Sequence, residues 1–339
     1  MDPNTPPKPS VVMAIETSCD ETAVAVLTAP NLLRASEVAS QIPLHQPYGG
    51  VVPEVASRSH LTQLKPLIRR ALDTAGMDIA EIDLFAATAG PGLATSLMLG
   101  TSAAKGLALG MGKPYLAVNH LEGHLLSPFF GNANGVEPCV ALVVSGGHTL
   151  LVKIDAPGEY RVLGRTHDDA AGEAFDKVGK LLRLPYPAGP HVDRLAAGGD
   201  RARFDFPRSM LHSGDFNFSF SGLKTSVRYM LPKLVNERIE DICASFQEAI
   251  VDVLVRKTLD AARAENARIV AVSGGVSCNS RLRERFRQAC EAAGMRLQLA
   301  EPKLCTDNAA MIAFVAVQKL AAGRFTALES DIDPNLRLG

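Results

Sequence analysis

The sequence predicts an α/β protein made of two similar lobes, each with a mixed sheet, and a cleft between them. Two observations support this fold class. A pattern of apolar strand, polar turn and apolar strand occurs at 11–27 and again at 139–154, which suggests an internal duplication. After each copy, amphipathic helices alternate with short buried strands, as in mixed α/β sheets.

Apolar spacing predicts each element in turn. In the first half we predict strands at Val11–Ile15, Ala23–Leu27, Leu84–Ala89 and Pro114–Val118, and helices at Glu54–Ala75 and Thr95–Leu109. In the second half we predict strands at Cys139–Val144, Leu150–Ile154 and Arg268–Ser273, and helices at Asp169–Leu182, Ile239–Glu265 and Ser280–Ala293. The last helix, Asn308–Ala322, is expected to pack back on the first half. The expected division is a disordered leader over 1–10, an N-terminal lobe of 11–136 plus 308–330, and a C-terminal lobe of 137–307.

The composition limits the classes of function. The chain has 339 residues and a net charge of −1, which excludes a generally basic nucleic-acid binder and leaves only local patches for such contacts. Six cysteines without a C-x-x-C pair are typical of a reducing compartment. The leader holds four prolines and no apolar stretch, and no segment has the uninterrupted apolar length of a membrane span. We therefore expect a cytoplasmic protein with no membrane contact.

Two histidines in the segment His120-Leu121-Glu122-Gly123-His124 are the strongest chemical signal. Side chains at i and i+4 lie on one face of a helix, so two neutral imidazoles can hold one metal. A zinc protease motif needs Glu directly after the first histidine, but Leu121 occupies that position and Glu122 lies roughly 200° around the helix. Such pairs also occur as packed or surface histidines, so a third ligand is required.

Carboxylates elsewhere in the chain are candidates to complete this site. Asp307 stands at the start of the last helix, where it is either an N-cap or a third ligand beside the two histidines. Asp20 and Glu21 lie at the first polar turn and either bind the metal or its water, or are solvated turn residues. The sequence leaves both alternatives open.

Two glycine-rich turns predict binding of a phosphorylated ligand. In Ser145-Gly146-Gly147-His148 the glycines allow close backbone approach, and successive amides can form an anion nest; an ordinary hairpin turn is the alternative. Gly274–Asn279 follows a buried strand and opens a helix, a placement that suits a nucleotide or a simple strand–helix turn. Asn279 offers both a donor and an acceptor to an adenine or a ribose.

Taken together, nine ordered motifs show a resemblance to a known family. They are ETSCDET (16–22), YGGVVPE (48–54), GPG (90–92), HLEGH (120–124), VSGGHT (144–149), GEAFDKVG (172–179), FSFSGLKT (218–225), GGVSCN (274–279) and TDNAA (306–310). From about Val12 to Arg324 the chain resembles the bacterial group of the tRNA N6-adenosine threonylcarbamoyltransferase family, within the actin/hexokinase/Hsp70-like ATPase superfamily.

The resemblance implies a fold, an activity and a set of site residues. The fold would be two duplicated actin-like (RNase H-like) lobes with an inter-lobe cleft. The activity would be transfer of the threonylcarbamoyl group from threonylcarbamoyl-AMP to N6 of the adenosine 3′ of the anticodon in tRNAs that decode ANN codons. One divalent metal, Fe²⁺ or Zn²⁺, would be held by His120, His124 and Asp307. The substrate loop would contain Val143, Val144, Ser145, Gly146 and Gly147, and the adenosine part of the adenylate would be held by Asp176, Gly189, Asp193 and Asn279.

The residue that takes the proton from the adenine amine is left open. Asp20 or Glu21 at the first turn is expected to act as the base, with His148 as a second candidate. The implied partners are tRNA, a shorter non-catalytic homologue that forms a heterodimer with this chain, and a small P-loop ATPase. Minor departures from the family pattern are Ala188, where the family often has Gly, and Cys278, which replaces a small residue.

The sequence leaves two alternative functions to be weighed and one surface feature unassigned. A small-molecule kinase of the same superfamily would use a similar cleft but would not need both histidines and Asp307. A non-catalytic partner protein would lack the metal histidines, which this chain has. Basic runs at Arg281, Arg283, Arg285 and Arg287 and at Lys177, Lys180 and Arg183 are either RNA contacts or solvated helix faces, and we do not assign them to RNA.

Overall fold

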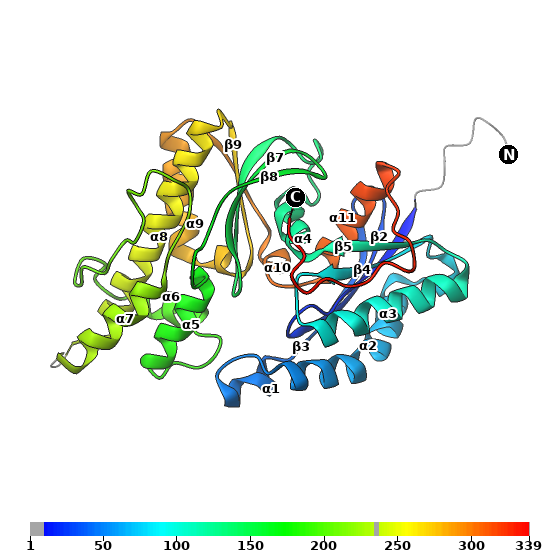
Figure 1. Cartoon of the computed structure of the whole chain (residues 1–339), viewed down its shortest axis with the longest axis horizontal. Coiled ribbons are helices and arrows are strands. Elements are labelled where there is room, and N and C mark those ends of the chain that lie inside the picture. The colour runs from blue at the N-terminus through cyan, green and yellow to red at the C-terminus, as the bar shows by residue number, and fades with distance from the viewer. Residues whose placement is uncertain (1–9, 234–236, 339) are drawn as a thin grey trace.

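Two five-stranded sheets of the same design form the framework of the protein. A computed structural model describes residues 10–233 and 237–338, so the expected leader lies outside the described residues except for Ser10. Within those ranges the sheets have the strand orders β3-β2-β1-β4-β5 and β8-β7-β6-β9-β10. In each sheet three antiparallel strands are followed by two parallel ones. The predicted α/β class with two lobes is confirmed, and Figure 1 shows one sheet with its helices in each lobe.

The first sheet is enclosed by helices on both faces. Its strands are β1 (Val11–Glu16), β2 (Glu21–Thr28), β3 (Leu32–Ser40), β4 (Leu84–Gly90) and β5 (Tyr115–Asn119). Its helices are α1 (Ile42–His45), α2 (Pro53–Ala75), α3 (Ala94–Met111), α4 (His120–Leu126) and α11 (Ala309–Ala321). Because side chains alternate along a strand, Met13 packs with α2 and α3 whereas Ala14 packs with α4 and α11.

The second sheet has the same two-sided burial. Its strands are β6 (Cys139–Val144), β7 (Thr149–Ala156), β8 (Glu159–Arg165), β9 (Ile269–Ser273) and β10 (Arg296–Leu299). The helices of this half are α5 (Ala171–Leu181), α6 (Gly189–Ala196), α7 (Ser221–Met230), α8 (Ile239–Ala264), α9 (Ser280–Ala292) and α10 (Pro302–Cys305). Leu142 faces the cluster around α8, while Val143 belongs to the cluster that contains α4 and α11. Helices α4 and α11 are therefore enclosed between the two sheets.

Several elements differ from the sequence prediction. Sequence analysis missed β3, β8 and β10, which are edge or outer strands with largely exposed residues, so that their apolar alternation is weak. It also missed the short helices α6 and α7. The first polar turn is shorter than expected, because Glu16 still pairs with Ala23 at the end of β1 and Glu21 already belongs to β2.

Helix α3 approaches this first turn very closely. A Cβ atom at Gly100 would overlap Oγ1 of Thr17. That hydroxyl is buried and donates a hydrogen bond of 2.8 Å to the carbonyl of Ser96. Gly100 is thus required by packing, and it lets α3 support the turn that leads into the cleft.

We expect Gly100→Ala to lower the free energy of unfolding by about 1–3 kcal/mol, because the added methyl overpacks the contact with Thr17. Gly106→Ala in the same helix is the control, since no atom lies within 4 Å of its added Cβ. That substitution should stabilise the protein by about 0.8–1.0 kcal/mol through helix propensity. Urea unfolding measures both changes, and equal effects at the two glycines would contradict the close packing.

Candidate functional site

Two adjoining cavities lie at the cleft. Residues of both lobes line the larger one, whereas only residues between 146 and 306, in the second half of the chain, line the smaller one. The larger has a volume of about 980 Å³ and is lined by residues of the first turn, the Gly49–Val51 lip, His120, the Ser145–His148 turn and Asp307. The smaller has a volume of about 380 Å³. Both are lined by Gly146, Asp176, Pro187, Gly275 and Thr306, so they open into one another. Their sizes match the usual range for small-molecule sites.

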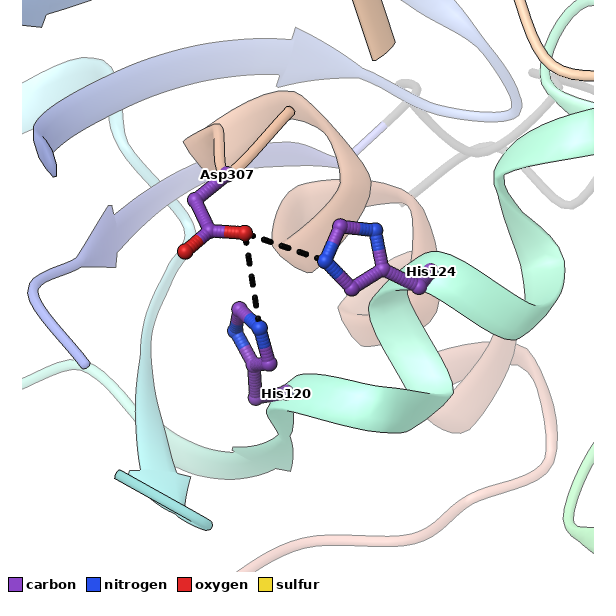
Figure 2. Close-up of side chains that lie close together, drawn as sticks. All are labelled: His120, His124 and Asp307. Carbon is purple, nitrogen blue, oxygen red and sulfur yellow. Dashed lines mark hydrogen bonds and ion pairs between the residues drawn. The ribbon is translucent and has the colours of Figure 1, made fainter. Parts of the chain in front are cut away.

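His120 and Asp307 lie at the floor of the larger cavity, and His124 lies fully buried beside them. Helix α4 begins at His120 directly after β5, and Asn119 caps it by accepting from the amide of Leu121. Nε2 of His124 lies 3.0 Å, and Nε2 of His120 3.5 Å, from Oδ1 of Asp307. Figure 2 shows both imidazoles pointing at the same carboxylate oxygen. Three such ligand atoms within 4.8 Å of one another are a suitable donor set for a metal ion.

Asp307 is not the cap of the last helix. The N-cap of α11 is Asn308, whose Oδ1 accepts from the amide of Met311 at 2.9 Å. The alternative that Asp307 acts as the cap is therefore wrong. Its carboxylate is instead directed at the two imidazoles.

Glu16 orients His120 from the opposite side and was not identified as a site residue by sequence analysis. Its carboxylate is fully buried, and Oε2 accepts from Thr88 Oγ1 at 2.6 Å and lies 3.1 Å from Nδ1 of His120. Oε1 accepts from the amide of Ser18 at 2.5 Å. In the neutral imidazole that binds a metal, we assign the hydrogen to Nδ1, which leaves Nε2 to face Asp307. The sequence signals were the position of Glu16 at the end of an apolar strand and its place as the first residue of the ETSCDET motif.

The electrostatics of this group follow from burial and opposite charges. Burial opposes ionisation of Asp307, but the charges of His120 and His124 hold its pKa below the ordinary value. The pKa of His120 is raised to about 9 by Asp307 and Glu16 against the effect of burial. Glu16 is completely buried, which raises its pKa, but the charge of His120 keeps this pKa below the ordinary value. Two ionised carboxylates around the imidazoles favour a cation at this position.

The arrangement fits a metal, and it does not fit a zinc protease. The Nε2 atoms of both histidines face Oδ1 of Asp307, and Nδ1 of His124 is buried without a hydrogen-bond partner among the described residues. Glu122 points away, accepting from the hydroxyl of Tyr160 at 2.9 Å and pairing with Lys319 at 2.7 Å. A carboxylate held in this way cannot serve as the base of the protease motif.

The three candidate bases, Asp20, Glu21 and His148, line the larger cavity and differ in how their pKa values are shifted. Burial raises the pKa of Asp20, and it raises the pKa of Glu21 to about 7. Oε1 of Glu21 accepts from Ser40 at 2.8 Å, while Oε2 is buried and has no partner among the residues described. Burial, together with the nearby histidines, lowers the pKa of His148 to about 4. His148 is therefore neutral near pH 7, whereas Glu21 can exchange a proton there.

The glycine turn presents free backbone donors. The amide of Ser145 donates to the carbonyl of His148, and the amide of His148 donates to Ser145 Oγ, which closes the turn. The amides of Gly146 and Gly147 have no acceptor within the described part of the chain, and both residues are exposed to the larger cavity. Val143 and Val144 precede the turn in β6 with fully buried side chains and line neither cavity.

The residues assigned to the adenosine surround the smaller cavity, which Asp176, Gly189, Asp193 and Asn279 line. Asn279 caps α9 by accepting from Leu282, and its amide donates to Gln247 at 2.6 Å. Asp193 accepts from the amide and hydroxyl of Ser280. Burial raises the pKa of Asp176, which accepts from the amide of Ala188.

The basic run on α9 is mostly committed to internal contacts. Arg281 pairs with Glu248 at 2.7 Å, and Arg285 pairs with the same carboxylate. Arg283 donates to the carbonyl oxygens of Ser277 and Ala300. These arginines tie α9 to its neighbours, which explains the run without an RNA contact.

Comparisons with known proteins agree with one another. The family model described as tRNA N6-adenosine threonylcarbamoyltransferase matches residues 33–314. A protein of that name from Paracidovorax citrulli is 51% identical over 325 residues, covering 94% of this chain and 93% of its own. Another, from a Geobacter species, is 49% identical over 327 residues, covering 96% of this chain and 95% of its own.

Solved structures show the same fold at low identity. Full-length HypF in its phosphate- and nucleotide-bound form has a TM-score of 0.62 at 12% identity, over 93% of this chain and 56% of that chain. Component A of (R)-2-hydroxyglutaryl-CoA dehydratase from Acidaminococcus fermentans has a TM-score of 0.55 at 14% identity, over 92% and 98% of the two chains. The expected actin-like fold is confirmed.

We expect Glu16→Gln to weaken Zn²⁺ binding about 10- to 100-fold, because the carboxylate that orients His120 is lost while its shape is kept. Glu122→Gln is the matched control, since that buried carboxylate lies on α4 beside the ligands but contacts Tyr160 and Lys319. Competition with a chelator measures the affinity of each folded variant. Equal losses in the two variants, or none in the first, would contradict this role for Glu16.

Proposed function

Because the chain belongs to the tRNA N6-adenosine threonylcarbamoyltransferase family, we propose that its cleft carries out the reaction named for that family. The chain is a transferase. It moves the threonylcarbamoyl group from threonylcarbamoyl-AMP to N6 of the adenosine 3′ of the anticodon in ANN-decoding tRNAs, and AMP leaves. The observation that carries the proposal is the meeting of His120, His124 and Asp307 beside a turn with free backbone donors.

We propose that the three residues hold one divalent ion, Fe²⁺ or Zn²⁺. Imidazole nitrogens with one carboxylate are a donor set that suits either metal. Glu16 supports this assignment, because a carboxylate behind a metal-binding histidine fixes the ring and its tautomer. When bound, such an ion supplies positive charge that polarises oxygens of the donor substrate.

The two cavities suggest where the substrates lie. The smaller cavity offers Asp193, Asp176 and Asn279 to the adenosine of the adenylate. Gly146 lines both cavities and Gly147 lines the larger one, and their free amides suit the phosphate or the carbonyl oxygen of the donor. The larger cavity then receives the target adenine, which lies in a tRNA loop and can be splayed out at low cost.

The chemistry requires a proton acceptor at the larger cavity. The N6 amine attacks the carbamoyl carbon, a C–N bond forms, the bond from that carbon to the phosphate oxygen breaks, and AMP departs. The amine loses one proton in this step. We propose that Glu21 accepts it, because this residue lines the larger cavity and its pKa of about 7 suits transfer near neutral pH. Asp20 shapes the same wall, and neutral His148 orients the substrate.

The proposal extends to partners and location. We propose that the chain works with a shorter non-catalytic homologue in a heterodimer and with a small P-loop ATPase. All six cysteines are free thiols, which supports a reducing compartment and hence the cytoplasm. Among the described helices, none combines the length and apolar character needed to span a membrane.

A small-molecule kinase of the same superfamily is the alternative. It shares the fold, so the likeness to solved structures does not separate the two functions. The site separates them, because a kinase cleft has no use for two imidazoles and a carboxylate directed at one point.

We expect radiolabelled threonine to enter an unmodified ANN-decoding tRNA transcript only when this chain is present. The mixture contains threonine, bicarbonate, ATP, the adenylate-forming enzyme and the partner proteins. Asp307→Asn and His120→Ala should each abolish the label, because each removes one of the grouped side chains, and circular dichroism checks that the variants fold. Full activity in both variants would remove the metal from the proposal, and phosphorylation of a small acceptor without tRNA would favour the kinase.

We expect the transfer rate to rise with pH and to level off above about 7, because Glu21 accepts a proton only when it is ionised. Below pH 7 the rate should fall about tenfold per pH unit. Glu21→Gln should lower kcat about 10²- to 10⁴-fold and abolish this pH dependence. Asp20→Asn is the comparison, and a pH profile that disappears there but survives in Glu21→Gln would assign the base to Asp20.

A further inference from the structure

One motif has no role in the site described so far. Phe218–Thr225 leads into α7, whose Lys224 and Arg228 both line the larger cavity. Their spacing of four residues places them on one face of the helix. The start of α7 is held by Asp168, which accepts from the hydroxyls of Ser219 and Ser221 at 2.6 and 2.7 Å. The helix that carries the two cations is therefore anchored to the rest of its lobe.

Lys180 joins them from the adjacent helix. Helices α5 and α7 lie side by side (Figure 1), and Lys180 at the end of α5 also lines the larger cavity. Its Nζ would lie 3.5 Å from a Cβ added to Gly49, so it reaches the lip of the opposite lobe. We call Lys180, Lys224 and Arg228 the mouth cations.

The mouth cations differ from the other basic residues around the cleft. Lys177, one turn before Lys180 on α5, pairs with Asp169 at 2.6 Å and with Glu173 at 2.8 Å. None of the three mouth cations has a carboxylate partner within the residues described. Lys180 and Arg228 are exposed, and Lys224 is half-buried. Three unpaired cations on one wall are available to an anionic ligand.

The position of the mouth cations indicates which anion they meet. None of them lines the smaller cavity that suits the adenosine of the donor. The floor of the larger cavity is acidic, with Asp20, Glu21 and Asp307. The wall formed by α5 and α7 carries four cations against the two carboxylates Glu173 and Asp176, so apart from the glycine turn this wall is where anionic groups are favoured. With a net charge of −1, the chain as a whole offers no general attraction to nucleic acid. A local basic wall has to supply it.

We propose that Lys180, Lys224 and Arg228 bind backbone phosphates of the tRNA anticodon loop where it enters the cleft. The inference rests on the proposed function, since it assigns a surface to the acceptor of that reaction. A loop whose backbone follows α5 and α7 can present one base inward to the acidic floor. The cations hold the backbone, and the cavity selects the base.

The size of the effect follows from counterion release. For single-stranded nucleic acid, each phosphate contact adds about 0.7 to the slope of log affinity against log salt, which corresponds to about fivefold in affinity at about 0.1 M salt. Removal of two contacts should therefore weaken tRNA binding about 25-fold and reduce the salt slope by about 1.4.

The test uses the Lys224→Ala/Arg228→Ala double variant in the complete transfer mixture. The KM for tRNA should rise about 25-fold at about 0.1 M KCl, with kcat and the KM for the adenylate unchanged, because a phosphate contact is made equally before and during the reaction. Lys224→Arg and Arg228→Lys keep the charge and should stay within about threefold of wild type. Arg287→Ala is the matched control, since that exposed arginine on α9 lines neither cavity.

Retention of labelled tRNA on a filter by the same protein mixture distinguishes a failure of the inference about the mouth cations from a failure of the proposed function. An unchanged tRNA KM and salt slope in the double variant would overturn the inference, as would a rise in the adenylate KM alone, which would assign the cations to the donor phosphate. An equal loss in Arg287→Ala would also overturn it. Wild-type protein that retains tRNA in a salt-dependent manner but transfers no label would contradict the proposed function instead.

Discussion

The enclosure of α4 and α11 between the two sheets is the constraint on which the rest of the structure depends. The two helices approach so closely that a Cβ at Gly123 would lie 3.0 Å from side-chain atoms of Met311 and Ile312. Helix α4 begins at His120, and α11 begins just after Asp307, so this packing determines where histidine and carboxylate meet. The reactive groups lie at the ends of buried elements, where packing holds them more precisely than a loop could.

Charge is distributed unevenly around the cleft, and the distribution suits a reaction between two anionic substrates. Carboxylates collect at the floor, where burial keeps the pKa of Glu21 near 7 while the imidazoles keep that of Asp307 low. Unpaired cations collect along α5 and α7. In the proposed reaction, phosphates would be directed to the wall and to the glycine turn, and a neutral purine would approach the acidic floor. Both substrates would then reach the site without bringing their phosphates together.

The two lobes share a sheet order but have different turns at equivalent positions. The turn after β1 follows Glu16, which contacts His120, and carries Asp20, whereas the turn after β6 carries two glycines with free amides. The repeated design supplies two hairpin tips that face one cleft, and one tip has carboxylates whereas the other has free backbone donors. The cleft is thus made asymmetric by side chains on a nearly symmetric framework.

The fold class, the family and the pairing of His120 with His124 were determined by the sequence alone, because local spacing and the order of short motifs carry that information. The outer strands escaped prediction, since exposed strands lack a clear apolar alternation. The role of Asp307 stayed open, and Glu16 was not identified, because a carboxylate near a turn has the same local pattern whether it is solvated or buried. Glu16 and His120 are 104 positions apart, and His124 and Asp307 are 183 apart. Only the tertiary structure decided these contacts, because they are made by pairing β1 with β4 and packing α11 on α4, and no local sequence pattern records which distant side chain fills the space beside an imidazole.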